Sequence, residues 1–173
     1  MIVRWGLEQL PGLLGEVGIE RPFLVASERW SHLDLPATGR WSEVPTDRIA
    51  EVVAAAEGSD GLLAVGGGSA IDLAKALSAT TGLELVSVPT TYSGAEWTDF
   101  FGVRDRSRRM KGGGSGARPA GIVYEPKLTV ELPRAQTGGT ALNALAHCAE
   151  ALYVSGRNMT GHEHALEGAR LIG

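Results

Sequence analysis

The amino-acid sequence predicts an α/β fold in which helices flank a parallel sheet, followed by a purely helical segment. Strand candidates alternate with helical stretches before residue 90, a pattern typical of β–α–β units. From residue 133 onward only helical patterns remain. We therefore expect an α/β domain over residues 1–132 and the incomplete beginning of a helical domain over residues 133–173.

The predicted strands of the first half are short apolar runs. Ile2–Trp5 is the first candidate, Phe23–Ala26 has the composition of a buried strand, and Arg40–Val44 is a weaker candidate. Gly61–Val65 is a continuous apolar run, as found in parallel strands buried on both faces, and Leu83–Val88 is the next strand candidate, ended by Pro89. The sheet is therefore expected to have its core strands here.

Three helices are predicted between these strands. Leu7–Val17 has a helical pattern, and Asp47–Glu57 follows Thr46 as a candidate N-cap. Ala70–Thr80 carries apolar residues at helical spacing, and Gly82 marks its end. Each helix would therefore cross from one strand to the next.

The second half changes character. Phe100–Arg104 and Ile122–Tyr124 are strand-like, and Lys111–Arg118 is expected to be a glycine-rich loop. Helices are predicted over Ala135–Val154 and Glu163–Ile172. Segments of about 40 residues rarely build a core of their own, so the apolar faces of these helices must pack on the first domain, a second copy or another chain. The chain is thus expected to end too early to function as a monomer.

Composition and charge exclude several protein classes. The chain has 173 residues and a net charge of −4, which gives no support for a nucleic-acid surface. The single Cys148 fits a reducing compartment, and no apolar run is long enough to span a membrane. The N-terminus lacks the layout of a signal peptide, so we expect a cytoplasmic protein.

A cluster of glycines indicates a candidate site. Gly66-Gly67-Gly68-Ser69 joins a predicted buried strand to a predicted helix, where backbone amides and the helix dipole can bind a phosphate or pyrophosphate. The alternative is a tight turn without a ligand, and the four residues alone do not decide between the two. The pattern matches neither the Walker motif nor G-x-G-x-x-G.

Four longer motifs follow one another along the chain: Gly66–Lys75, Val88–Glu96, Ile122–Thr129, and Gly139–His147 followed by Glu150–Tyr153. Together they resemble the iron-containing alcohol dehydrogenase superfamily, which also holds glycerol dehydrogenase and dehydroquinate synthase. The stretch Pro-Thr-Thr-Tyr-Ser-Gly-Ala-Glu within the second motif is most similar to maleylacetate reductases. Family members are about twice as long, with a dinucleotide-binding α/β domain followed by a helical domain that supplies much of the active site. The resemblance therefore implies a Rossmann-like dinucleotide-binding domain over residues 1–132.

The resemblance also implies roles for individual residues. The glycine turn, Gly66 to Ser69, would hold the cofactor pyrophosphate, and Asp72 would lie beside the nicotinamide half. Hydroxyl groups would contact cofactor or substrate. The implied cofactor residues are Gly66, Gly67, Gly68, Ser69, Asp72, Thr90, Thr91 and Ser93.

Two further cofactor contacts rest on looser matches. Glu28 falls near the acidic ribose-binding position, where a carboxylate repels a 2′-phosphate and so slightly favours NAD(H) over NADP(H). An ordinary exposed carboxylate is the alternative for Glu28. A cationic residue near the cofactor matches Arg109 or Lys111.

Asn143 and His147 lie four residues apart, on one face of a predicted helix. In metal-dependent relatives an Asp and a His at this spacing bind the metal, whereas maleylacetate reductases resemble this chain in having Asn and need no metal. A neutral amide is a poor ligand for a hard cation, so no metal is expected. The resemblance then implies that Asn143 contacts the substrate and that His147 is the catalytic residue. His162 and His164 are expected to be solvated.

Two function classes follow from this resemblance. In the first, the chain is the cofactor-binding part of an NAD(P)-dependent oxidoreductase, related to maleylacetate reductase or alcohol dehydrogenase, that acts on a small organic substrate. A separate chain or a second copy would complete its helical domain. In the second, it is a non-catalytic nucleotide-binding or scaffold subunit. Neither nucleic acid nor membrane is an expected partner.

Overall fold

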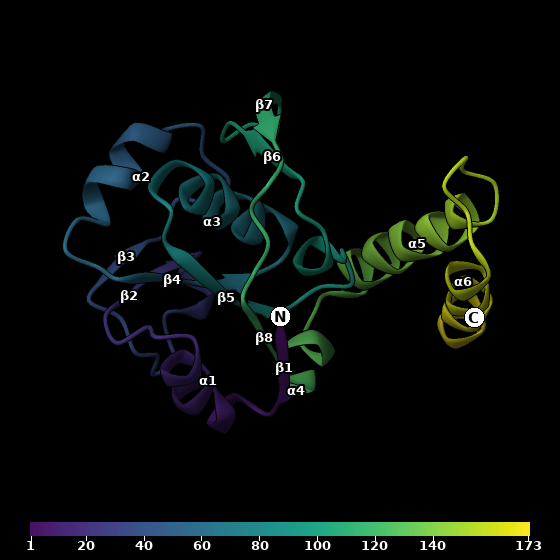
Figure 1. Ribbon diagram of the computed structural model, residues 1–173, viewed down its shortest axis with the longest axis horizontal. Helices are drawn as coiled ribbons and strands as arrows, with labels where there is room; N and C mark the ends of the chain where they lie inside the picture. Colours follow the sequence, from purple (N-terminus) through teal and green to yellow (C-terminus); the bar gives the residue numbers. More distant parts are fainter. The chain divides into compact units, whose positions relative to one another are not determined.

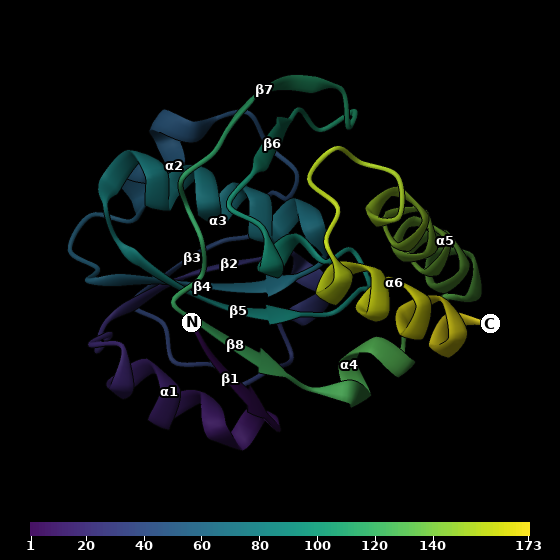
Figure 2. The same ribbon diagram turned by 45° about the vertical axis from the view of Figure 1, so that its right-hand side comes forward.

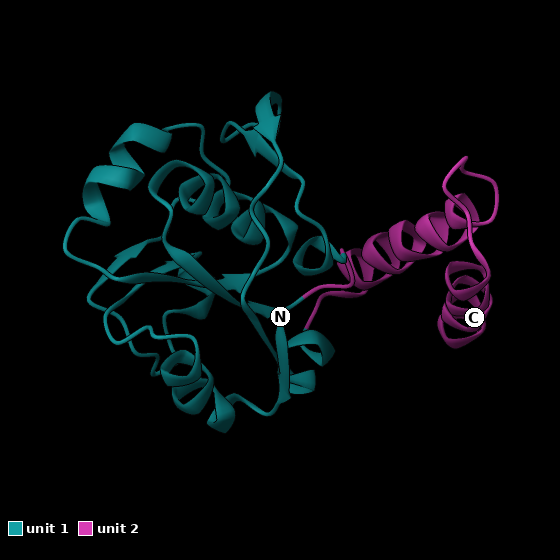
Figure 3. Ribbon diagram, in the orientation of Figure 1, with its two compact units in different colours: residues 1–90, 94–131 teal, residues 91–93, 132–173 magenta.

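The computed structural model describes all 173 residues and divides into two compact units. The first comprises residues 1–90 and 94–131, and the second comprises residues 91–93 and 132–173 (Figure 3). The first unit is α/β and the second is helical.

A six-stranded parallel sheet forms the centre of the first unit, which confirms the predicted fold class. Its strand order is β1-β8-β5-β4-β2-β3, and every neighbouring pair is parallel. The strands are β1 (Ile2–Trp5), β2 (Pro22–Ala26), β3 (Gly39–Trp41), β4 (Gly61–Gly66), β5 (Glu84–Pro89) and β8 (Gly121–Tyr124). The candidate Arg40–Val44 is realised only as the three-residue edge strand β3.

Helices cover both faces of this sheet (Figures 1 and 2). On one side α1 (Leu10–Glu16) and α4 (Pro126–Val130) contribute to a core that includes Leu63 and Val65 of β4. On the other side α2 (Ile49–Ala55) and α3 (Gly68–Thr81) pack against Leu62 and Ala64. Successive side chains of a strand point to opposite faces, so an uninterrupted apolar strand supplies both cores.

Helix α3 has the clearest local signals. It starts from Gly67 as its N-cap and ends at Gly82, whose left-handed backbone (φ 76°) is the conformation that glycine adopts at a helix C-terminus. By contrast, α2 starts from Arg48, not from Thr46. The Thr46 hydroxyl instead donates to Glu43, although it also accepts a bond from the Arg48 amide.

Two elements were not predicted. Met110–Gly114 is strand β7, which pairs antiparallel with β6 (Phe101–Arg104), so part of the expected glycine-rich loop is a hairpin. The short helix α4 follows β8, where Glu125 caps the helix by accepting from the Lys127 amide and Pro126 occupies its first position. Proline suits that position because its missing N–H has no helical partner there.

Three short 3₁₀ segments complete the first unit, η1 (Leu7–Gln9), η2 (Glu28–Trp30) and η3 (Ala95–Trp97). The second unit contains α5 (Arg134–Ala151) and α6 (Met159–Ile172), which contact each other. Asn158 caps α6 by accepting from the Gly161 amide, so this helix begins four residues before the predicted start. None of the helices has both the length and the apolarity needed to cross a membrane.

Candidate functional site

The glycine turn lies between β4 and α3, at the carboxyl edge of the sheet. Gly66 has φ 152°, and a Cβ atom on it would lie 2.9 Å from the Cβ of Ala70. A larger residue at position 66 would therefore have to displace the first turn of α3. Gly67 follows as the N-cap and supplies no side-chain cap, so the start of the helix is left open.

Three backbone amides point away from any partner at this turn. The N–H groups of Gly67, Gly68 and Ser69 form no hydrogen bond, and all three residues are partly exposed. The first amides of a helix have no partner within it, and the helix dipole adds positive potential at the same place. The arrangement provides donors for an anion with several oxygens, such as a pyrophosphate.

The turn also lies where the chain changes direction across the sheet. From β2 the chain continues to its outer neighbour β3, whereas from β4 it continues through α3 to β5 on the other side. In open parallel sheets such a switch leaves a crevice outside the carboxyl ends of the two strands, and ligands bind there. The free amides follow β4 and are therefore at this crevice.

Residues after β2 line the same place. Glu28 begins η2, is exposed, and its carboxylate has no hydrogen-bond or ion-pair partner. Trp30 of the same segment is buried, and its indole Nε1 lies 4.0 Å from where a Cβ on Gly66 would be. The predicted ribose-binding segment and the glycine turn are thus brought close together.

Thr90 follows β5 and completes the backbone of the turn. Its amide donates to the Gly66 carbonyl at 3.0 Å, and the residue is buried. This bond fixes the end of β5 to the end of β4. Thr90, one of the predicted hydroxyl residues, therefore lies directly beside the glycine turn, held there by its backbone amide.

Asp72, in the first turns of α3, is directed at the hairpin. Its Oδ2 accepts from the Gly102 amide at 3.2 Å. Burial raises the pKa of this carboxyl group, while Lys75 and Arg104 act in the opposite direction. The carboxylate thus already holds a backbone group of the neighbouring strand.

Lys75, one turn further along α3, is a site residue that sequence reasoning did not single out. It is fully buried, and its Nζ donates to the carbonyl oxygens of Ala95 and Phe100 and to the Thr98 hydroxyl. Burial lowers the pKa of Lys75, opposed by the carboxylates of Asp72, Glu96 and Asp99. The signal in the sequence that could have indicated its burial is that this lysine stands within a helical run of apolar residues.

Glu96 is a second buried charge that the sequence analysis passed over. Its Oε1 accepts from the Tyr124 hydroxyl at 2.9 Å, and that hydroxyl accepts from the Trp97 indole at 2.7 Å. The other oxygen, Oε2, has no partner. Burial raises the pKa of Glu96 and is also the main cause of a raised pKa at Tyr124.

Both candidate cations of the hairpin are tied to one carboxylate. Arg109 and Lys111 form ion pairs with Asp105 at 3.2 and 3.4 Å, and both are exposed. Each side chain lies at the surface, where such pairs break at small cost. The geometry does not choose between them.

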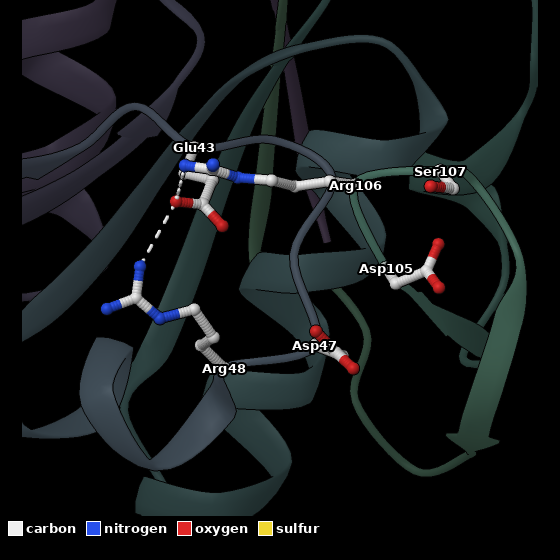
Figure 4. A pocket seen from close by; sticks show the side chains of 6 residues that line it. All are labelled: Glu43, Asp47, Arg48, Asp105, Arg106 and Ser107. Atoms are coloured by element: carbon white, nitrogen blue, oxygen red, sulfur yellow. Dashed lines mark hydrogen bonds and ion pairs between the residues drawn. The ribbon is translucent and has the colours of Figure 1, made fainter.

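A hollow of about 340 Å³ lies elsewhere, between the β3–α2 connection and the tip of the hairpin (Figure 4). Its polar lining includes the Arg106 side chain, which reaches Glu43, a carboxylate also paired with Arg48 (Figure 4). The lining residues are Glu43, Asp47, Arg48, Asp105, Arg106 and Ser107. It contains none of the predicted site residues, and its acids and bases largely neutralise one another.

Comparison with known proteins decides the family. The sequence profile of iron-containing alcohol dehydrogenases matches residues 4–126. The chain belongs to the iron-containing alcohol dehydrogenase family. A maleylacetate reductase from Burkholderia cepacia is 40% identical over 126 residues, which cover 73% of this chain and 36% of that protein.

Two solved structures have the same fold as this chain. A maleylacetate reductase from Agrobacterium tumefaciens superposes with a TM-score of 0.86 at 28% identity, over 99% of this chain and 54% of that one. A sulfoacetaldehyde reductase from Bifidobacterium kashiwanohense, determined in complex with NAD⁺, superposes with a TM-score of 0.83 at 20% identity, over 99% of this chain and 57% of that one. The chain thus spans about half the length of these two solved proteins, and 36% of the Burkholderia cepacia reductase.

The second unit carries the remaining candidate residues of this family member. Asn143 and His147 are exposed on α5, and His147 Nδ1 lies 3.3 Å from the Glu150 carboxylate. The Thr91 hydroxyl forms no hydrogen bond. No group of three or more His, Cys, Asp or Glu side chains converges in the chain in a way that could hold a metal ion.

Proposed function

We propose that this chain is the cofactor-binding part of an NAD(P)-dependent oxidoreductase of the maleylacetate reductase type. The observation that carries the proposal is the set of three unpaired amides at Gly67, Gly68 and Ser69, which open onto the crevice between β2 and β4. These donors and the absence of side chains at the two glycines fit a pyrophosphate. When bound, the nicotinamide supplies the hydride that reduces the substrate.

Other groups of the first unit each support or contact a different part of the dinucleotide. Gly66 allows the sharp turn, and Thr90 holds it in place. The unpaired carboxylate of Glu28 accepts bonds from ribose hydroxyls and slightly favours NAD(H) over NADP(H). Arg109 or Lys111 contributes a positive charge after leaving Asp105.

The remaining candidate residues are assigned to the nicotinamide and the substrate. Asp72 borders the nicotinamide half of the site, and the Thr91 and Ser93 hydroxyls contact cofactor or substrate. On α5, Asn143 hydrogen-bonds a carboxylate or carbonyl of a small organic substrate, and His147 supplies a proton. We propose this chemistry without a metal, since Asn143 brings no charge to a cation.

A further helical domain is needed for turnover, because α5 and α6 alone enclose no substrate. We propose that a separate chain supplies it, or that a second copy covers the same faces. Exposed apolar side chains on both helices, among them Leu142 and Leu166, support such an association. A chain that binds the dinucleotide but reduces nothing when the helical half of a maleylacetate reductase is added would instead be a nucleotide-binding subunit without catalysis.

Titration calorimetry with NADH and NADPH tests the proposal on the intact chain and on Gly68→Val. Position 68 has no left-handed φ, so valine is compatible with its backbone. The added side chain would stand where the pyrophosphate has to approach the amides, and binding should be lost. Gly12→Val on α1 is the matched control, because a Cβ there meets nothing within 4 Å. Equal affinity in wild type and Gly68→Val, with the fold intact, would contradict the proposal.

A further inference from the structure

The segment from Gly94 to Arg104 is fastened to α3 by a buried lysine. Lys75 has no exposed surface, and its Nζ donates to the Phe100 carbonyl at 2.8 Å, to the Thr98 hydroxyl at 3.1 Å and to the Ala95 carbonyl. An ammonium group has three N–H donors, so all of them are used. The lysine therefore fixes three points of one loop at once.

Asp72 fastens the far end of the same segment. Its carboxylate accepts a hydrogen bond from the amide of Gly102, two residues beyond Phe100, the last acceptor of Lys75. Residues three apart on a helix lie on one face, so α3 presents an acceptor and a donor side by side to this loop. The helix that begins at the glycine turn thereby sets the path of the chain from η3 into β6.

Such an arrangement costs folding free energy, which an apolar core would avoid. Lysine is almost never fully buried unless it is paired, and here the donors meet backbone carbonyls and a hydroxyl, with no carboxylate in direct contact. A methionine at position 75 would fill similar space without desolvating a charge. The presence of a buried lysine at this position is explained if function requires that the 94–104 loop follow this path.

We propose that Lys75 is a positioning residue for the nicotinamide half of the bound dinucleotide. The proposal rests on the proposed function: with the pyrophosphate at the start of α3 and the adenosine toward β2, the nicotinamide half extends over β5. The 94–104 segment belongs to the connection that leaves β5. Lys75 touches no cofactor in this scheme and acts through the loop that it holds.

The test compares two ligands, ADP and NADH, by titration calorimetry on the full chain. ADP carries only the adenosine and pyrophosphate part, so it reports on the glycine turn and the Glu28 segment but not on the nicotinamide half. In Lys75→Met the affinity for NADH should fall about tenfold, equivalent to ~1.4 kcal/mol, while the affinity for ADP stays within about twofold. Lys127→Met is the matched control, because Lys127 is exposed and its side chain has no bond; it should change neither affinity.

Each other outcome counts against one of the two proposals. If wild type binds neither ADP nor NADH, the proposed function fails and the role of Lys75 fails with it. If wild type binds both ligands and Lys75→Met lowers the two affinities equally, or lowers neither, the proposed function stands and the positioning role is wrong.

A milder variant covers the case in which Lys75→Met does not fold. Thr98→Val removes one of the three acceptors of Lys75 at an exposed residue, so the fold should tolerate it. It should lower the affinity for NADH by about threefold relative to ADP, in the same direction as Lys75→Met. An unchanged ratio of the two affinities in Thr98→Val would overturn the positioning role.

Discussion

Strand β4 in the first unit and helix α5 in the second differ in how much of their apolar surface is covered. All six residues of β4 are buried, whereas none of the eighteen residues of α5 is. Leu63 of β4 is 0% exposed and Leu142 of α5 is 67% exposed. The same side chain thus stabilises the fold in one region and is left in water in the other.

This contrast corresponds to the two tasks of the proposed function. The α/β unit builds two complete cores around its sheet, and it can hold a glycine turn in a fixed geometry. The helical unit has one buried apolar side chain besides Leu132, that of Ala165, and presents its larger ones outward. The first unit therefore supplies the stability, and under the proposed function it binds the nucleotide while the second unit provides the surface for association.

The largest expected effect comes from deleting the same side chain in both regions. Leu63→Ala should lower the free energy of unfolding by about 2–5 kcal/mol, because it leaves a cavity in a filled core. Leu142→Ala should change it by about 0.5 kcal/mol or less, since that side chain loses little burial. Urea denaturation followed by circular dichroism measures both.

A large decrease in the free energy of unfolding of Leu142→Ala would contradict this contrast between β4 and α5. It would mean that the α5 face is covered in solution, and light scattering on the same samples would then have to show an oligomer. A monomer with a costly Leu142→Ala would contradict the assignment of association to the second unit.

An intermediate effect is expected at Glu96, where a buried carboxyl group sits in the stable unit. Its raised pKa means that the folded state favours the protonated form, so its contribution to stability is present below about pH 4.5, the ordinary pKa, and is lost as pH rises through the raised pKa. Glu96→Gln stays neutral, and the Tyr124 hydroxyl can still donate to the amide oxygen.

The free energy of unfolding of Glu96→Gln minus that of wild type should therefore increase from pH 4 to pH 8. Denaturation curves at both pH values give this difference. Glu163→Gln on the exposed face of α6 should show no such trend. A difference that falls with rising pH would show that ionised Glu96 stabilises the fold.

The smallest effect is expected at the tip of the hairpin. Arg106 pairs with Glu43, but its side chain is 76% exposed, and Glu43 keeps Arg48 as a second partner. Arg106→Ala should cost about 0.5 kcal/mol or less and should cost still less in high salt. A loss above about 1.5 kcal/mol, unchanged by salt, would show that the hairpin is part of the stable core.

Patterns local in sequence were enough to predict the strands, the glycine turn and α3. The apolar run Gly61–Val65 and the glycines at 66–68 and 82 each encode their structure within a few residues. The elements that escaped prediction depend on partners or on weak propensities. Strand β7 contains three glycines and exists through its pairing with β6, which no propensity of its own indicates.

Within the candidate site, the position of the glycine turn between a strand and a helix was predictable in the same way. That β2 and β4, the strands before Glu28 and the glycine turn, are neighbours follows only from the strand order of the sheet. Lys75 was not predictable as a site residue, because its three acceptors lie 20 to 25 residues further along the chain. Contacts of that range emerge only from the packing of α3 against the connection after β5.

Amide chemical-shift mapping by ¹⁵N NMR during an NADH titration tests the central claim most directly, since the claim concerns three particular N–H groups. Gly67, Gly68 and Ser69 should show the largest shifts, because their amides gain partners that they lack in the free chain. The hollow that includes Glu43 and Arg106 should be silent. Shifts concentrated around that hollow, with the glycine turn unchanged, would contradict the account.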